Sequence, residues 1–424
     1  MKILFVTHGL PFGPPGGAKM RSGELIRAVS GEHEVHLITT TWESELQYRA
    51  LTRQEVASFD FVVNTSNRFT KTCAAARGLL KRRPLTVAPF YVEETAEKIR
   101  TFLRQNEVDL IVLEESFIAP YMDSIPRNYR GRVVIDFHNV ASHQFRSIAR
   151  LGLIGRRKRL ARMLDSFIMP NWEGRYASRA DHCFVVSEEE ARRLRNVAPR
   201  VPISVVANGI QPAVPLGEAK GKDTLLFVGT MAYEPNADAM RYFCASILPL
   251  IRMRIPKTRL YIVGIAPPAD IRAFGAERPP QRTALANALE SIVVTGEVRD
   301  VRPYYDVANI MVVPLRAGGG TRLKILEAMA LGRPVVSTSL GCEGLAVKHG
   351  EHIMIADEPR DFADTVVELL ENPTLARRLC RNARRLIESH YDWSLLRAQF
   401  SRTCAQNDEA EADASNALLE GVRA

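Results

Sequence analysis

The residues with the clearest chemical potential lie in one glycine-rich turn of the second half of the chain. Residues 310–338 read IMVVPLRAGGGTRLKILEAMALGRPVVST, which predicts a strand, a turn at the glycines 318–320 and a helix starting near Thr321. The first amides of a helix have no partner inside it and attract anions, and glycine lets a ligand approach the backbone closely. Arg322 and Lys324 would oppose the helix dipole there, unless an anion such as a diphosphate lies between them.

The same helix carries a carboxylate that could act with the lysine. Lys324 and Glu327 are three residues apart and share a helix face. One could hold a phosphate while the other accepts hydroxyl protons from a sugar ring. The alternative is a plain glycine turn with solvated cations. The order of residues is neither GxxxxGK[ST] nor GxGxxG, so a Walker A loop is absent and a nicotinamide dehydrogenase is disfavoured.

A histidine follows a strand-like run in the first half. His138 comes directly after VVIDF and could act at a reaction centre, although a lone histidine at a strand end is often only a hydrogen-bonded structural residue. Its spacing from His143 does not suit one helical face, and Asp136 has no partner in the sequence. No Asp-x-Asp occurs and no pair of nucleophilic carboxylates is identifiable. We therefore expect neither a metal site, nor a cofactor, nor a covalent intermediate.

Two halves with the same pattern must position these residues. Short apolar runs alternate with helical segments, which predicts an α/β fold with two doubly wound parallel sheets and ligand sites at the carboxyl ends of the strands. The clearest predicted helices span 18–30, 237–255 and 321–331. The predicted strands are 2–7, 35–40, 110–113, 133–137 and 183–187 in the first half and 224–229, 259–264, 292–295, 310–314 and 334–338 in the second.

Composition and charge narrow the class of protein. The 424 residues include 46% hydrophobic and 25% charged residues, which is typical of globular domains, and the six cysteines form no CxxC. Those cysteines fit a reducing, cytoplasmic compartment, and we expect neither a signal peptide nor a membrane span. The connector VVANGIQPAVP (205–215) marks a domain boundary, and 405–424 reads as a loose, disordered tail.

The positive charge is confined to the first half of the chain. Residues 1–205 hold 31 Lys and Arg against 22 Asp and Glu, whereas residues 206–424 hold 26 of each. The densest run, from Arg156 to Arg162, lies in a segment, 145–164, that resembles a basic amphipathic helix on a membrane. We therefore expect contact with an anionic membrane surface, against the alternative of a solvated helix beside a cleft. No nucleic-acid signature accompanies the charge, so no nucleic acid is expected.

The segment GGGTRLKILEAMALGRPVVST (318–338) resembles the donor-binding segment of the family 4 glycosyltransferases, retaining enzymes of the GT-B fold. Other segments resemble the family in the same order, so the resemblance covers nearly the whole chain. They are PPGGAKMRSGELIRAVS, VVIDFHNV, FVVSEEEARRL, VVANGI, LLFVGTM, VVTGEVRDVRPYYDVANIMVVPL and DWSLLRAQF.

The resemblance implies a domain plan and an activity. Two Rossmann-like domains would face each other across a cleft, residues 1–205 binding the acceptor and residues 206–390 binding the nucleotide sugar. Residues 391–404 would form a helix crossing back to the N-terminal domain. The enzyme would be a hexosyltransferase that moves a sugar from a nucleotide-diphosphate sugar to a lipid-linked, saccharide or small-molecule acceptor, with retention. It would work in the cytoplasm, peripherally at the inner face of the membrane.

The resemblance also implies roles for single residues. His138 would contact the transferred sugar or the acceptor, and Glu327 the ribose hydroxyls; both are the expected catalytic residues. The expected donor-binding residues are Gly16, Gly17, Gly229, Val298, Gly318, Gly319, Gly320, Thr321, Arg322, Lys324 and Glu327.

This chain departs from the family pattern in two places. Many members have a second glutamate eight positions before the one matched by Glu327, where this chain has Gly319. Many also carry an Arg and a Lys after the first strand of the second domain, where GTMAYEPNADA has neither. Two alternatives stay open: a sugar-nucleotide epimerase on the same fold, and a catalytically idle sugar-nucleotide-binding protein.

Overall fold

The computed structural model describes residues 1–13, 16–65, 84–152, 155–275 and 292–405, with only the backbone at 156–158. The predictions that involve Leu153, Ile154, the side chains at 156–158 and the tail at 406–424 therefore lie outside the described residues.

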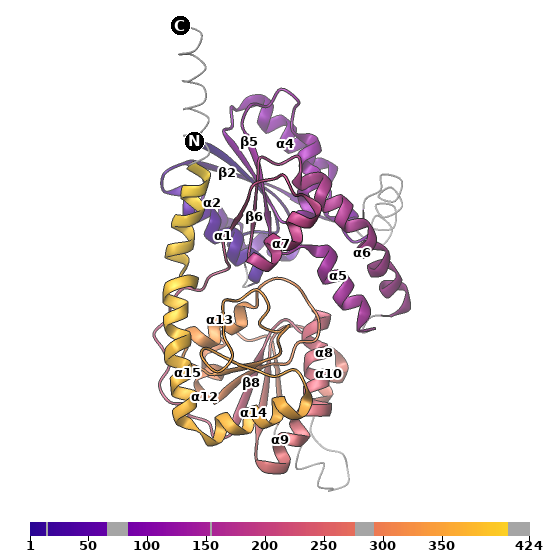
Figure 1. The fold of residues 1–424 in the computed structure, drawn as a ribbon. Helices are drawn as coiled ribbons and strands as arrows, with labels where there is room; N and C mark the ends of the chain where they lie inside the picture. Colours follow the sequence, from indigo (N-terminus) through magenta and orange to yellow (C-terminus); the bar gives the residue numbers. More distant parts are fainter. Residues whose placement is uncertain (14–15, 66–83, 153–154, 276–291, 406–424) are drawn as a thin grey trace. The chain divides into compact units, whose positions relative to one another are not determined.

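The chain forms two compact units. The first comprises Met1–Ser142, Leu164–Asn208 and Trp393–Ala424, and the second comprises His143–Met163 and Gly209–Asp392. The sequence plan assigned the whole of residues 1–205 to one domain, whereas residues 143–163 pack with the second unit. In each unit, helices lie on both sides of the strands (Figure 1).

The first unit contains a seven-stranded parallel sheet in the order β3-β2-β1-β4-β5-β6-β7. Its inner strands are buried along nearly their whole length, as expected where helices cover both faces. Its elements, in chain order, are β1 (Lys2–His8), α1 (Gly17–Ser30), β2 (Glu34–Thr41), η1 (Glu43–Tyr48), α2 (Arg49–Gln54), β3 (Ser58–Val63), η2 (Ala88–Phe90), α4 (Glu93–Gln105), β4 (Leu110–Glu114), η3 (Ser116–Ser124), β5 (Arg132–Phe137), α5 (Ala141–Arg150), α6 (Arg156–Ala177), β6 (His182–Val185), α7 (Glu188–Val197) and β7 (Ile203–Val205).

A helix from the far end of the chain completes the core of the first unit. Residues 393–405 are helical, and Trp393, Leu396 and Phe400 pack into the cluster that holds the buried side chains of β1, β4 and α1. The Gln399 amide donates to the Val205 carbonyl over 2.8 Å. The last helix is therefore an integral part of a unit whose other strands come from the first half of the chain.

The second unit contains a six-stranded parallel sheet in the order β10-β9-β8-β11-β12-β13. The elements are β8 (Thr224–Val228), α8 (Glu234–Tyr242), η4 (Phe243–Ile247), α9 (Leu248–Arg254), β9 (Arg259–Val263), α10 (Ala269–Phe274), β10 (Ile292–Gly296), α12 (Arg302–Val307), β11 (Ile310–Val313), α13 (Leu323–Ala330), β12 (Val335–Ser337), β13 (Met354–Ile355), α14 (Pro359–Glu371), α15 (Pro373–Leu386) and η5 (Ile387–Tyr391).

The predicted class is confirmed by these two parallel sheets, but three of the predicted helices need correction. The predicted helix 237–255 is interrupted by the π-helical turn Phe243–Ile247, after which Pro249 stands in the first turn of α9. The helix after the glycine turn starts at Leu323, so Arg322 caps it rather than lying in its first turn. Strand β3, at Ser58–Val63, was not predicted.

The third correction concerns the single amphipathic helix expected across 145–164. The segment breaks after Arg150, and Gly152 has a φ of +67°, which ends α5 before α6 begins. Phe145 and Ile148 are 3% and 2% exposed, so they face the protein interior rather than a membrane. Within the described part of the chain, no helix is both long and apolar enough to cross a bilayer.

Candidate functional site

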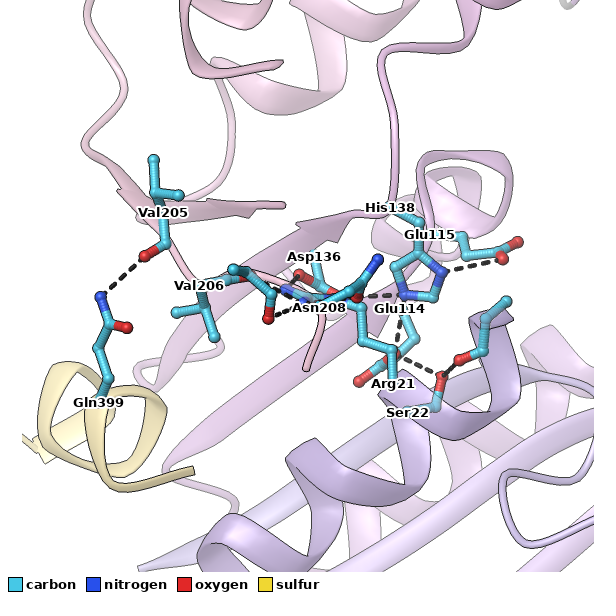
Figure 2. Close-up of polar contacts among 12 residues, drawn as sticks. Arg21, Ser22, Glu114, Glu115, Asp136, His138, Val205, Val206, Asn208 and Gln399 are labelled. Atoms are coloured by element: carbon cyan, nitrogen blue, oxygen red, sulfur yellow. Dashed lines mark hydrogen bonds and ion pairs between the residues drawn. The ribbon is translucent and has the colours of Figure 1, made fainter. Parts of the chain in front are cut away.

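In the first unit, three ionisable side chains meet where β4 and β5 end. Glu114 and Asp136 stand opposite each other in the register of these neighbouring strands, and His138 follows β5 by one residue. The His138 Nε2 atom lies 3.0 Å from Asp136 Oδ2 and 3.3 Å from Glu114 Oε2, while Nδ1 lies 3.1 Å from Glu115 Oε1 (Figure 2). The histidine is thus held by three carboxylates.

An arginine from helix α1 neutralises one of these carboxylates. The Arg21 guanidinium donates Nε to Asp136 Oδ2 over 2.7 Å and Nη2 to Oδ1 over 2.6 Å, a bidentate pair in which both side chains are almost fully buried. Its Nη1 donates to the Val206 carbonyl and to Asn208 Oδ1. Arg21 therefore fixes β5 to the last residues of the unit before the chain leaves it (Figure 2).

The charges of this cluster follow from its geometry. Burial alone disfavours a charged imidazole, but the hydrogen bonds that the ring donates to Asp136, Glu114 and Glu115 outweigh it and raise the pKa of His138 well above 6.5. Burial would also raise the pKa of Asp136, yet the Arg21 guanidinium holds that pKa well below its usual range. For Glu114, burial dominates and raises the pKa. His138 is accordingly an imidazolium at neutral pH.

A second histidine shows that position at a strand end does not set this charge. His8 ends β1 in the same sheet and packs against the rings of Trp42 and Phe90. Burial lowers the pKa of His8 to about 4. The carboxylates around His138 are therefore what distinguishes the two histidines.

The backbone next to His138 is strained. Glu115 has a φ of +81° and a ψ of +141°, a region that residues with a Cβ rarely adopt. This conformation turns the Glu115 carboxylate toward the imidazole. Strain of this kind collects at functional sites, which supports a working role for the cluster.

Glu114, Asp136 and His138 are also the described residues that could together hold a metal ion, since one ligand atom from each lies within 4.8 Å of the others. Arg21 already bonds both Asp136 oxygens and His138 is protonated, so a cation would have to displace two positive charges. The residues therefore fit a metal ion poorly.

In the second unit, glycines follow one another along the carboxyl edge of the sheet. Gly229, Gly264 and Gly296 stand at the ends of the neighbouring strands β8, β9 and β10. A Cβ on Gly264 would lie 1.9 Å from the Gly229 carbonyl oxygen, so these two backbones meet only because side chains are absent. This edge therefore presents main-chain atoms to whatever binds there.

Lys324 projects toward this edge from the first turn of α13. Its Nζ donates to Asn236 Oδ1 over 2.9 Å and lies 3.9 Å from the centre of the Phe227 ring. A Cβ on Gly229 would come within 2.6 Å of that Nζ. Burial, together with the charge of Arg322, lowers the pKa of Lys324 well below 10.5. Among the residues that the structure describes, no carboxylate pairs with this ammonium.

Glu327 lies one helical turn further along α13. Its Oε2 accepts a hydrogen bond from the Tyr305 hydroxyl over 2.9 Å, and burial raises its pKa despite that bond and the charge of Lys324. The charge of Asp300, in the bend after β10, also raises that pKa. Val298 is half-buried in the same bend.

Arg322 makes main-chain contacts that the sequence did not predict. Its guanidinium is buried and donates to the carbonyls of Gly319 and Gly320, and it also approaches Leu340 O at 3.5 Å. Gly318 and Gly320 have φ values of +126° and +69°. Arg322 thus holds together a turn that needs glycine at two positions.

The structure divides the predicted site residues between the two units. Gly229, Val298, Thr321, Lys324 and Glu327 belong to the second unit, together with the glycines 318–320 and Arg322. His138, Gly16 and Gly17 belong to the first unit, where Gly16 caps α1 and a Cβ on it would meet nothing within 4 Å.

Several residues of these clusters were not predicted. Arg21 shares a helix face with Leu25 and Val29, and a charged residue on an apolar helix face could have indicated a buried ion pair. The two glutamates Glu114 and Glu115, which directly follow the apolar run LIVL, could have indicated a site at that strand end. Nothing in the sequence marks Asn236 or Tyr305.

Comparison with known proteins gives the family. Residues 15–214 match the family model described as Glycosyltransferase Family 4, and residues 222–372 match Glycosyl transferases group 1. Phosphatidyl-myo-inositol mannosyltransferase of Mycobacterium tuberculosis is 23% identical over 318 residues, 73% of this chain and 76% of that protein. An uncharacterised 44.6 kDa protein from the cps region of Klebsiella pneumoniae is 26% identical over 168 residues, 40% of this chain and only 42% of that protein.

Solved structures share the fold. Sucrose-phosphate synthase from Thermosynechococcus elongatus superimposes with a TM-score of 0.66 at 16% identity, covering 96% of this chain and 99% of that one. Anabaena HepE, solved with UDP and glucose, gives 0.62 at 15% identity, covering 96% and 99%. The named relatives do not favour the epimerase and idle-protein alternatives. Both family models, in chain order and over most of the sequence, show that the chain is a glycosyltransferase of family 4.

Proposed function

We propose that the donor is a nucleoside-diphosphate sugar whose diphosphate binds at the carboxyl edge of the second sheet. The observation that carries this is the ammonium of Lys324, which is partly buried beside Gly229 and lacks a carboxylate partner among the described residues. A buried cation is costly without an anion, and a diphosphate would supply one. The amides of the turn at 318–320 would add neutral donors.

The remaining roles follow from this position. Glu327 already accepts a hydrogen bond from the Tyr305 hydroxyl, and it would accept hydrogen bonds from the ribose hydroxyls in the same way. The imidazolium of His138 would lie beside the transferred sugar, and its positive charge would stabilise negative charge that develops during transfer. We propose retention of configuration at the transferred carbon and no metal requirement, so activity should persist in a chelator and NMR of the first product should show the donor's anomeric form.

The donor proposal is tested by product release. The enzyme is incubated with a panel of nucleoside-diphosphate sugars, beginning with UDP-glucose because HepE was solved with it. The nucleoside diphosphate that is freed when the sugar passes to an added saccharide acceptor or to water is measured. We expect release by the wild type and at least about a tenfold loss in Lys324→Ala, because a charge-assisted hydrogen bond contributes about 1.5–3 kcal/mol. Equal release by the variant would refute the assignment of Lys324.

We further propose that α6 binds the anionic cytoplasmic face of a membrane, which would bring the enzyme to a lipid-linked acceptor. Large apolar side chains with 43–72% exposure recur along one face of α6 at the spacing of helical turns. They are Leu160, Met163, Leu164 and Phe167. Arg146, Arg150 and Arg159 are exposed on α5 and α6, which suits anionic headgroups.

Vesicle binding tests the membrane proposal. Phe167→Glu should reduce sedimentation with vesicles containing phosphatidylglycerol at low salt, because it removes apolar area and adds a like charge. Met253→Glu is the matched control, since Met253 is 78% exposed in the second unit and is not part of α6. The proposal would be contradicted if the wild type did not sediment with these vesicles, or if both variants lost vesicle binding equally.

A further inference from the structure

A pocket of about 970 Å³ opens at the amino edge of the second sheet. Three of the residues that line it, Asp223, Asn309 and Pro334, directly precede β8, β11 and β12. In a parallel sheet the amino ends of the strands share one edge. The pocket is therefore separated by the length of the strands from Gly229 and the turn at 318–320, and it lies wholly within the second unit.

The charge of the pocket is strongly positive. Six Lys and Arg side chains line it, against two carboxylates, Glu218 and Asp223. The cations are Lys222, Arg333, Arg377, Arg381, Arg384 and Arg385. Glu218 pairs only with Arg377, at 3.6 Å and in an exposed position, where an ion pair contributes little.

Three of the arginines form a ridge along α15. Arg377, Arg381 and Arg385 are spaced by four residues, so like charges lie one above the other on the same helix face, an arrangement that destabilises the helix by itself. Within the described residues, neither Arg381 nor Arg385 has a carboxylate within ion-pair distance. The repulsion among these arginines destabilises the helix, and an anion bound in the pocket would relieve it.

The two other arginines hold the wall of the pocket in place. Arg333 donates Nη1 to the Gly217 carbonyl over 2.8 Å and Nε to the Tyr305 carbonyl over 2.7 Å. Arg384 donates Nη1 to the carbonyls of Ala213 and Ala330 over 2.6 and 2.9 Å. The segment opposite α15 is therefore fixed before any ligand arrives, and a preformed site loses less entropy on binding.

Much of the remaining lining is apolar. It includes Pro215, Leu216, Pro334, Leu369, Leu370, Pro373 and Ala376. Ligand pockets of this kind, apolar with a few convergent polar groups, span roughly 300–1,000 Å³. An inorganic anion would leave most of this volume and the apolar wall unused.

We propose that this pocket binds a phosphate-bearing molecule with an apolar body, its phosphate against the arginine ridge and its apolar part against the proline and leucine wall. The assignment does not depend on the proposed donor site, because the two lie at opposite edges of the sheet.

Calorimetry with dodecyl phosphate, below the concentration at which it forms micelles, tests the proposal. We expect saturable binding to the full-length wild type, with dodecanol, inorganic phosphate and glucose 6-phosphate each binding at least about tenfold more weakly. Glucose 6-phosphate separates a sugar phosphate from an alkyl phosphate, so tighter binding of it would overturn the apolar part of the proposal. Equal binding of inorganic phosphate would indicate an adventitious anion and overturn all of it.

Variants locate the binding. Arg381→Glu should weaken dodecyl phosphate binding by about tenfold or more, because it removes one charge-assisted contact and adds a repulsive charge. Arg378→Glu, on the same helix but outside the pocket lining, should change it by less than about twofold. Melting temperatures confirm that both variants fold. Undiminished binding in Arg381→Glu, equal loss in both variants, or displacement by saturating UDP would refute the site.

Discussion

The two units use the carboxyl edges of their sheets in different ways. In the first unit the edge is a set of ionisable side chains that already pair with one another: Arg21 with Asp136, and His138 with three carboxylates. In the second unit the edge is main chain, opened by glycines, with one partly buried ammonium that lacks a carboxylate partner among the described residues. The first arrangement keeps an imidazole positively charged, whereas the second is suited to binding a negatively charged ligand.

The largest effect expected from this comparison is on turnover. His138→Gln should lower kcat by about 10²–10³-fold, the range for the loss of one group that stabilises charge in the transition state. His182→Gln is the control, because His182 starts β6 at the opposite edge of the same sheet. Steady-state release of nucleoside diphosphate measures both. An increase in KM with an unchanged kcat would contradict a role of His138 in the transfer step.

A smaller effect, on donor binding, is expected in the second unit. Lys324→Ala should weaken nucleoside-diphosphate binding by about 10–100-fold and leave the melting temperature unchanged or higher, because a buried cation is removed. Lys324→Arg should rescue little, since a planar guanidinium does not replace a compact ammonium between Asn236 and Phe227. Full binding by the alanine variant would show that this edge is not a phosphate site.

The neighbouring cation should behave in the opposite way. Arg322→Ala should lower the free energy of unfolding by about 1–3 kcal/mol, because the carbonyls of Gly319 and Gly320 lose a charged donor. Urea unfolding of this variant beside Lys324→Ala measures the contrast. Equal stability of the two variants would contradict the assignment of Arg322 to the turn.

The smallest expected effect is a pH dependence of opposite sign at the two sites. His138 has a pKa raised by folding, so its contribution to stability is complete below about pH 6.5 and is lost as the pH rises through the folded-state value. Lys324 has a pKa lowered by folding, so its cost is present at neutral pH and disappears as the pH approaches its unfolded value.

Urea unfolding at several pH values measures both signs. The stability advantage of wild type over His138→Gln should shrink from pH 6 to pH 9, by up to about 1.4 kcal/mol per unit of pKa shift. The advantage of Lys324→Ala over wild type should also shrink as the pH rises. A His138 advantage that grows with pH would contradict the imidazolium.

The sequence predicted the sheets better than the clusters, for physical reasons. Ten predicted strands match observed ones because apolar runs between turns reflect burial on both faces of a parallel sheet. Strand β3 was missed because Ser58–Val63 is largely exposed or half-buried and carries an acid, so no apolar run marks it. The break at Gly152 was missed because the apolar pattern continues on both sides of it.

The candidate site could be predicted in part. Lys324 and Glu327 follow from helical spacing, and His138 from its place after a strand. The surroundings of His138 could not, because Glu114 reaches it from β4 and Arg21 reaches the neighbouring Asp136 from α1. Only the register of β4 beside β5 brings Glu114 and Asp136 together. Arg322 was assigned to an anion because the turn carbonyls that it bonds are main-chain atoms, which the sequence does not display.

The central claim is that the second unit binds the donor diphosphate while His138 acts in transfer. UDP binding by calorimetry and turnover, measured on the same preparations of Lys324→Ala and His138→Gln, test it directly. We expect that Lys324→Ala loses UDP affinity and that His138→Gln binds UDP within about twofold of wild type but turns over at least a hundredfold more slowly. Loss of UDP affinity in His138→Gln, with unchanged affinity in Lys324→Ala, would contradict it.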